Sequence, residues 1–141
     1  MHAVVSACVG SSVEGLYEFR ATVRIDGVTF IFKHNGYYYL FVSWDYCCQG
    51  SKSNYRVAVG RSKTVDGPYL DPEGKDMRDG GGMLFLEGDK TYFEAAGHCA
   101  AYTFDGEDIF ICHGYSVAHG GASILIQRSI HWTSDGWPKL N

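Results

Sequence analysis

The chain has 141 residues, of which 45% are hydrophobic and 15% aromatic, and its formal net charge at pH 7 is −4. This length builds one ordinary hydrophobic core, and the composition excludes a disordered class. No basic run offsets the negative charge, which argues against nucleic-acid binding through a cationic face. The first nine residues are apolar but lack a basic start and are too short for a secretory signal or a membrane span, so we expect no membrane association and assign no localisation.

The composition favours an all-β fold. Eighteen glycines stand against three prolines, together with ten tyrosines and eight phenylalanines, which is typical of short strands joined by tight turns. No helical period of apolar residues is visible. In chain order, alternation and β-forming residues predict strands over Ala3–Gly10, Gly15–Val23, Thr29–Lys33, Tyr37–Trp44, Tyr55–Ser62, Met83–Glu87, Gly97–Phe104, Asp108–Tyr115 and Ser123–Trp132.

Turn residues join these strands into two meanders. Asn35-Gly36 is the strongest two-residue hairpin signal of the chain, and Asp105-Gly106 and Gly120-Gly121 connect the last three strands. The first meander has four predicted strands. The second has only three, so we expect its open edge to pair with a strand from elsewhere.

The five cysteines are Cys8, Cys47, Cys48, Cys99 and Cys112, an odd number without the spacing of zinc ligands. Cys47 and Cys48 are too close in sequence for an ordinary bridge. We therefore expect structural free thiols. A vicinal disulfide between Cys47 and Cys48 is the alternative.

Several motifs occur in a fixed order along the chain. They are the run from Ile31 to Gly50, Gly60-Arg61-Ser62-Lys63, Gly67-Pro68-Tyr69-Leu70, Gly97-His98, Cys112-His113-Gly114-Tyr115 and Asp135-Gly136-Trp137-Pro138. Their order and spacing resemble the glycoside hydrolase family 43 arabinanases, which cut α-1,5-linked arabinan with a five-bladed β-propeller. Each motif alone is weak, but several in sequence make chance a poor explanation.

The resemblance implies an all-β, partial five-bladed β-propeller made of one domain. A four-stranded propeller repeat needs about 40 to 50 residues, so the chain corresponds to the last two blades, residues 29–88 and 89–141. Residues 1–28 then correspond to a divergent remnant of the preceding blade. Because open sheet edges need partners, we expect the ring to be completed by a homodimer or another homo-oligomer.

The catalytic carboxylates of the family have no full counterpart in this chain. Inverting hydrolysis uses a carboxylic acid and a carboxylate about 6.5 to 9.5 Å apart, and the resemblance places both Asp positions upstream of Met1. The position of the Glu acid, just before the strand at Phe30, holds Gly27. The candidate catalytic acids are Asp26, which a one-residue step turns to the opposite face, and Glu14, which lies thirteen residues before Gly27. For each, the alternative is a solvated carboxylate near a turn.

The candidate binding residues also come from the resemblance. His98 matches the family's histidine that faces the central channel and helps to hold a hydrated cation, calcium or sodium; the alternative is a hydrogen-bonded core residue. Trp44, Asp45 and Tyr46 follow a central strand, where propeller loops open onto one end of the channel. Aromatic rings beside a carboxylate stack on and hydrogen-bond sugars. We expect Asp45 and Tyr46 to contact sugar, and Trp44 either to do so or to pack between blades.

The resemblance implies an inverting endo-1,5-α-L-arabinan hydrolase with arabinan or arabino-oligosaccharide as partner. Since the catalytic positions are missing or displaced, we expect the chain alone to be inactive. The alternatives are a non-catalytic carbohydrate-binding module and a structural half-propeller that assembles as a homo-oligomer. Members of the family are often secreted or periplasmic.

Overall fold

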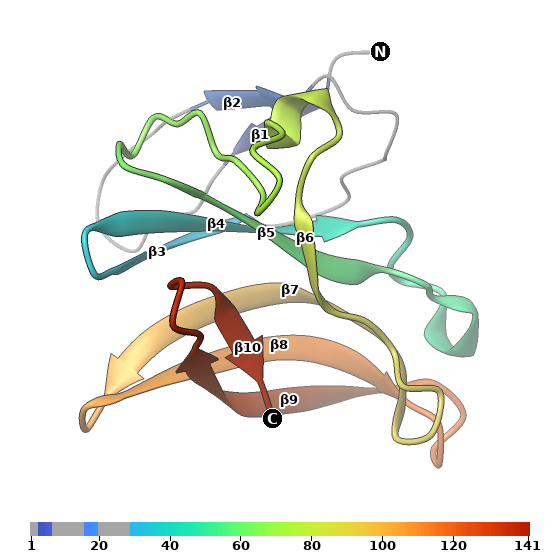
Figure 1. The fold of residues 1–141 in the computed structure, drawn as a ribbon. Coiled ribbons are helices and arrows are strands. Elements are labelled where there is room, and N and C mark those ends of the chain that lie inside the picture. Colours follow the sequence, from blue (N-terminus) through green and yellow to red (C-terminus); the bar gives the residue numbers. More distant parts are fainter. Residues whose placement is uncertain (1–2, 7–15, 20–28) are drawn as a thin grey trace.

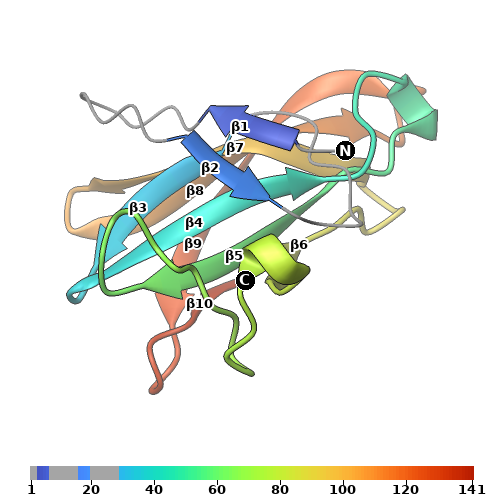
Figure 2. The same ribbon diagram turned by 90° about the horizontal axis from the view of Figure 1, so that it is seen from above.

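The computed structural model describes residues 3–6, 16–19 and 29–141, and these form three stacked layers of antiparallel β-structure (Figures 1 and 2). The first layer pairs β1 (Ala3–Ser6) with β2 (Leu16–Phe19). The second is a four-stranded sheet in the order β3-β4-β5-β6, and the third a four-stranded sheet in the order β10-β9-β8-β7. Their bounds are β3 Phe30–His34, β4 Tyr37–Trp44, β5 Arg56–Ser62, β6 Met83–Leu86, β7 Phe93–Phe104, β8 Glu107–Ser116, β9 Ala122–Trp132 and β10 Pro138–Leu140.

The strands predicted from Thr29 onward are confirmed, with small changes at their ends. Of the two earlier predicted strands, Ala3–Ser6 and Leu16–Phe19 are described as strands, and the rest lies outside the described residues. Turn chemistry explains the hairpins, because both residues of Asn35-Gly36 (φ 46° and 76°) and of Asp105-Gly106 (φ 50° and 82°) have the positive φ of a type I′ turn. β7 begins at Phe93, whereas the predicted strand began at Gly97. The sheet therefore starts closer to the preceding loop than the alternation indicated.

The expectation that the second meander lacks its own fourth strand is wrong. β10 pairs antiparallel with β9, with Pro138 opposite Trp132. The chain reverses in a turn in which Thr133 N–H donates to the Trp137 carbonyl (2.9 Å) and Gly136 has φ 81°. The third layer thus closes its outer edge with residues of the same chain.

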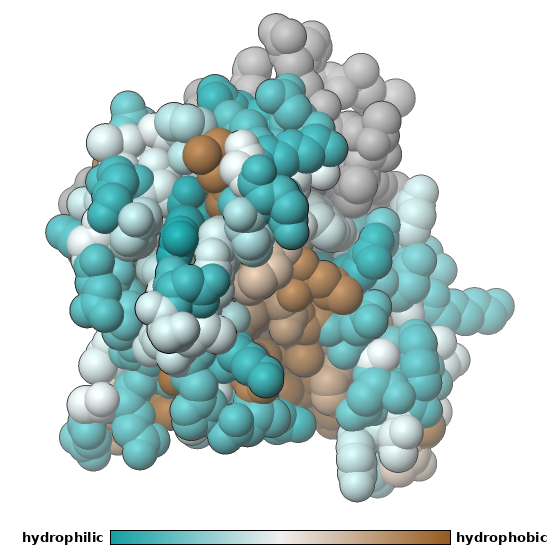
Figure 3. Space-filling view, viewed as in Figure 1, coloured by the Kyte–Doolittle hydropathy of each residue, from teal (hydrophilic) through white to brown (hydrophobic). Residues whose placement is uncertain are grey.

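The main core lies between the second and third layers. β7 contacts β3, β4 and β5, and the ring of Phe41 lies 5.0 Å from that of Phe85 and 5.7 Å from that of Phe110. Figure 3 shows apolar surface between the two sheets beside β10 and below β6. Burial of such rings is the largest stabilising term available to the sheets.

The opposite face of the second layer has its own apolar cluster. Leu40, Val42 and Ala58 alternate with the residues that face the main core and pack with Tyr69 and Met77. Met77 belongs to a short helix, η2 (Met77–Asp79), which contacts β2 of the first layer. The second layer is therefore covered on both faces, as expected of a sheet inside a stack.

One end of the two sheets is tied by a polar contact. His34 stacks on Trp132 at 3.8 Å, and its Nδ1 lies 3.0 Å from Asp108 Oδ2, which also accepts from Trp132 Nε1 at 2.8 Å. The twist of the β3-β4 hairpin carries the His34 ring onto β9. Within the described ranges, no helix has the length and apolar character needed to cross a bilayer.

Candidate functional site

Three loops meet at one end of the two sheets, at the right of Figure 1. They are residues 45–55 with the short helix η1 (Gly50–Lys52), residues 87–92 and residues 117–121. Val117 N–H donates to the Tyr92 carbonyl at 3.1 Å, and η1 contacts β7, β8 and β9. We call this surface the loop end. It brings together segments that lie more than sixty residues apart in sequence.

The sequence-predicted binding residues lie at the loop end, where β4 stops. Asp45 has φ 69° and its Oδ2 accepts from Arg56 Nε at 2.8 Å, and the Arg56 guanidinium lies 5.7 Å from the Trp44 ring. Trp44 packs against Gly82, where a Cβ would come within 2.8 Å of the indole. Trp44 therefore packs inside the fold, Asp45 carries an ion pair, and Tyr46 presents a ring that is 45% exposed.

The cysteine pair forms part of this end. The structure joins Cys47 and Cys48 in a vicinal disulfide, so the expectation of free thiols is wrong for these two residues. Cys47 packs against the buried cluster of Tyr55, Ala95 and Tyr115, and Cys48 N–H donates to Tyr115 Oη at 2.7 Å. The left-handed backbone of Cys48, with φ 66°, folds the pair into a tight turn. The expectation is confirmed for Cys99 and Cys112, which are free and buried.

Behind the disulfide lies a cluster of rings that sequence reasoning did not find. Tyr55 is buried and its hydroxyl is hydrogen-bonded to His113 Nδ1. Tyr115 lies 5.7 Å from Tyr55 and 4.7 Å from His113, edge to face with the imidazole. Burial raises the pKa of Tyr55, so the hydroxyl stays protonated and donates to His113. His113 and Tyr115 belong to one motif on β8, but no local pattern places Tyr55 beside them, because Tyr55 precedes β5 in the other sheet.

His98 sits beside this cluster at a β-bulge of β7. Its backbone has φ 51°, its N–H donates to Ser43 Oγ at 2.9 Å and its side chain is exposed. The register of β7 against β8 shifts between Gly97 and Cys99, and such bulges re-aim a side chain. The alternative of a buried core histidine is therefore not what the structure shows.

The cation expected at His98 stays a prediction. Calcium and sodium prefer oxygen ligands, whereas His98 and the nearby His113 offer ring nitrogens. Among the residues that the structure describes, no three His, Cys, Asp or Glu side chains gather into a metal site. The residues therefore fit a calcium or sodium ion poorly, and the function proposed below does not depend on one.

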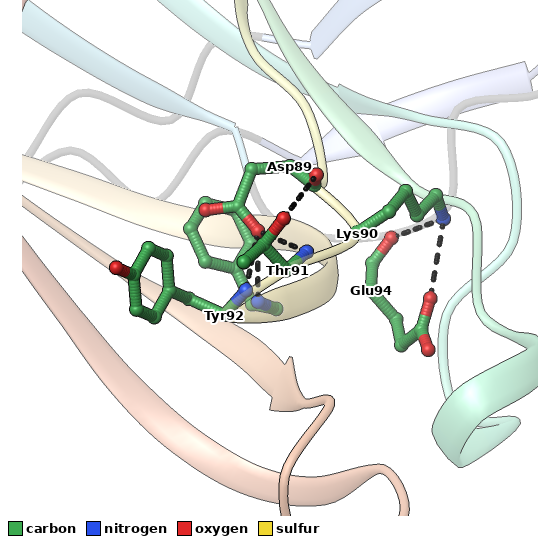
Figure 4. A network of polar contacts seen from close by, with 6 residues as sticks. Asp89, Lys90, Thr91, Tyr92 and Glu94 are labelled. Atoms are coloured by element: carbon green, nitrogen blue, oxygen red, sulfur yellow. Dashed lines mark hydrogen bonds and ion pairs between the residues drawn. The ribbon is translucent and has the colours of Figure 1, made fainter.

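The loop before β7 is fixed by Asp89 (Figure 4). Its carboxylate accepts the N–H groups of Thr91 (2.8 Å), Tyr92 (2.6 Å) and Phe93 (3.2 Å). Partial burial acts to raise the pKa of Asp89, but these three donors outweigh it, so the pKa is lowered. Lys90 also pairs with Glu94, at 3.6 Å. The network holds the Tyr92 ring, 73% exposed, on the loop end. Asp-x-Thr before an exposed aromatic is a sequence signal that could have found it.

The two candidate acids, Glu14 and Asp26, lie outside the described residues. Thr29, directly before β3, is described. Its hydroxyl is buried and, among the described residues, has no hydrogen-bond partner. A buried hydroxyl without a partner costs stability.

The stability of the fold is expected to fall in mild acid because of His113. Burial, followed by the charge of His98, lowers the pKa of His113 below its ordinary 6.5. The unfolded chain then takes up a proton more readily than the folded chain, so the free energy of unfolding decreases as pH drops below about 6.5. Urea unfolding at pH 7.5 and pH 5 checks this. His113→Gln should reduce the pH dependence, whereas the exposed His131→Gln should not; equal slopes in all three proteins would contradict the assignment.

Comparison with known proteins identifies the relatives of this chain. The model of "Glycosyl hydrolases family 43" matches residues 10–138. The extracellular exo-alpha-(1->5)-L-arabinofuranosidase ArbA of Cellvibrio japonicus is 45% identical over 112 residues, which are 79% of this chain and 32% of that protein. The extracellular endo-alpha-(1->5)-L-arabinanase 1 of Bacillus subtilis is 40% identical over 104 residues, 74% of this chain and 31% of that protein.

Solved structures of arabinanases are also similar to this chain. An exo-1,5-alpha-L-arabinanase from a bovine ruminal metagenomic library superposes with a TM-score of 0.78 at 51% identity, covering 80% of this chain and 36% of that chain. The Cellvibrio cellulosa alpha-L-arabinanase complexed with arabinohexaose gives 0.77 at 44% identity, with the same coverage of 80% and 36%. This chain thus spans about a third of the length of these relatives. The two four-stranded sheets are blades of the same kind of propeller, and the chain belongs to glycoside hydrolase family 43.

Proposed function

We propose that this chain supplies an arabinan-binding face of a family 43 propeller and does not hydrolyse arabinan by itself. The substrate class is suggested by the relatives, which are named for arabinanase and arabinofuranosidase activity. The match to an arabinanase solved with arabinohexaose also supports it.

The observation that carries the proposal is the convergence of the loop end. Tyr46 and Tyr92 come from different layers, yet both rings are exposed on this surface, at 45% and 73%. Exposed rings stack on the C–H faces of sugars, and a loop surface on a rigid sheet scaffold is where binding residues concentrate. Asp45 stands next to Tyr46 with its carboxylate oriented by Arg56, which suits it to accept a sugar hydroxyl.

Asp89 and Asp45, two carboxylates of the loop end, do not support hydrolysis. Inversion needs a general acid whose pKa is raised, so that it still carries a proton near neutral pH. Asp89 has a lowered pKa and accepts three backbone N–H groups. Asp45 is held by Arg56 at 2.8 Å. Gly27 stands at the position of the family's acid.

Isothermal titration with arabinohexaose tests the binding. Tyr92→Ala and Tyr46→Ala are each expected to weaken affinity about tenfold, because each removes a stacking ring. Tyr102→Ala is the matched control: Tyr102 is 52% exposed but lies near the far end of β7, the strand that follows Tyr92, away from the loops. Equal affinities of all three variants and the unaltered chain would contradict the proposal.

Release of reducing sugar from arabinan tests the second part of the proposal, that the chain does not hydrolyse arabinan by itself. The unaltered chain is expected to bind arabino-oligosaccharide without turnover. Turnover that is lost in Glu14→Gln or in Asp26→Asn would contradict this and would identify that carboxylate as the acid.

A second candidate is a structural half-propeller that pairs with another copy. The far face of the third layer carries Leu125, 73% exposed, and the half-buried Ile109 and Ile111, whereas the other face packs on the second layer. A two-fold interface would cover this face in both copies. Light scattering should then give the mass of a dimer that Leu125→Glu converts to monomer, and a monomeric unaltered chain would exclude it.

A further inference from the structure

A cavity opens at the opposite end of β4 and β5 from the loop end. Its volume is ≈ 410 Å³, and its walls include Tyr37, Arg61, Lys63, Leu70, Asp71 and Trp137. This is within the range of small-molecule sites, about 300 to 1,000 Å³. The segments that form it are the β3-β4 hairpin, the long connection from β5 to β6 and the turn before β10.

The floor of this cavity is a fixed guanidinium. Arg61 lies between two rings, with its Cζ 4.6 Å from the centre of Tyr37 and 4.4 Å from that of Trp137. Its Nη1 donates to the Asp135 carbonyl at 2.7 Å, and its backbone pairs with Leu70 in both directions, at 2.8 and 2.9 Å. A side chain held in this way loses little further freedom when it binds an anion.

A second cation stands at the rim. Lys63 Nζ lies 3.5 Å from the centre of the Tyr37 ring, and the side chain is exposed. A hydrogen bond from Lys63 and then its charge lower the pKa of the Tyr37 hydroxyl. Lys63, Arg61 and Tyr37 therefore form one contiguous group at the cavity.

The charges of this group are not balanced by a carboxylate. Asp71 lines the cavity, but its Oδ1 accepts the N–H groups of Glu73 (3.1 Å) and Lys75 (2.8 Å), and its Oδ2 that of Gly82 (3.1 Å). Asp135 bonds through Oδ1 to Thr133 Oγ1 at 2.5 Å. Among the described residues, neither Arg61 nor Lys63 lies within ion-pair distance of a carboxylate. Within the described part of the chain, the cavity thus carries two cations that no carboxylate meets at ion-pair distance.

We infer that this cavity binds an acidic sugar through its carboxylate, as a uronate. Arg61 and Lys63 supply charge-assisted donors to the carboxylate, while Leu70 and Pro68 give the sugar ring an apolar wall. A bare oxyanion would leave most of the cavity unfilled, and a neutral sugar would leave both cations unpaired. The inference does not rest on the proposed arabinan face, which lies at the other end of the strands.

Isothermal titration of the full chain with D-galacturonate tests the inference. Saturable binding is expected, weaker at high salt, and Lys63→Gln should reduce affinity about tenfold without affecting folding, because Lys63 is exposed. Lys33→Gln is the matched control, since Lys33 also lies over a tyrosine, 5.1 Å from the centre of Tyr38. It should bind like the unaltered chain.

Three results would overturn the inference. They are unchanged affinity in Lys63→Gln, equal binding of galactose, and equal binding of inorganic phosphate. Arabinohexaose titrated into Lys63→Gln should bind as it does to the unaltered chain. Failure of arabinan binding and failure of the uronate site are therefore separate outcomes.

Discussion

Phe41→Ala is expected to lower the free energy of unfolding by about 3 to 5 kcal/mol. Phe41 is fully buried, and its ring lies between those of Phe85 and Phe110, at 5.0 and 5.7 Å. The substitution removes the ring and leaves a cavity that β4 and β8, each fixed by ladders on either side, cannot close. Domains of this size are stable by about 5 to 15 kcal/mol, so most of the stability is at risk. Urea unfolding followed by tryptophan fluorescence measures the change.

The control for Phe41 is Leu125→Ala. Leu125 is 73% exposed on the far face of the third layer, and its loss should change the free energy of unfolding by no more than about 0.5 kcal/mol. If the two variants were equally stable, the packing of the second layer on the third would not be the main core of the molecule.

Gly121→Ala is expected to push the loop of residues 117–121 away from the loop of residues 45–55 at the candidate site. Gly121 has φ +84°, and a Cβ there would lie 2.2 Å from Ser51 N and 2.7 Å from the Gly50 carbonyl carbon. Both are backbone atoms, so they cannot rotate away. The left-handed backbone adds about 1 to 2 kcal/mol of strain for a non-glycine residue. We expect a loss of stability above that strain, and a loss of arabinohexaose binding.

Gly120→Ala separates the effect of backbone strain from the effect of the collision with η1. Gly120 also has a positive φ, +60°, but a Cβ there would meet nothing within 4 Å. It therefore shares the backbone strain and lacks the collision with η1. Thermal unfolding and arabinohexaose titration of both variants give the comparison, and an equal effect on binding would show that the contact between the two loops does not matter for the site.

The sequence predicted the local part of the fold well. β4 runs from Tyr37 to Trp44, as predicted, because alternation and the Asn35-Gly36 turn are properties of neighbouring residues. β10 was missed because it is three residues long and depends on the turn at Gly136. The place of His34 was missed because its partners, Trp132 and Asp108, belong to the other sheet.

One part of the candidate site could be predicted for the same local reason. Trp44, Asp45 and Tyr46 follow one strand directly, so their position at its end could be read from the hairpin. The Asp-x-Thr signal could mark Tyr92 locally, but the place of Tyr92 and His113 at the same end as Tyr46 follows only from the stacking of two sheets. The vicinal disulfide depends on the left-handed turn at Cys48, and residue spacing alone argued against it.

The measurement that tests this account most directly is an NMR titration of the isotope-labelled chain with arabinohexaose. The account predicts amide shifts that saturate and are confined to residues 45–55, 87–92 and 117–121, with the hexasaccharide still intact at the end of the titration. Shifts centred instead on the cavity around Lys63, or no shifts at all, would contradict it.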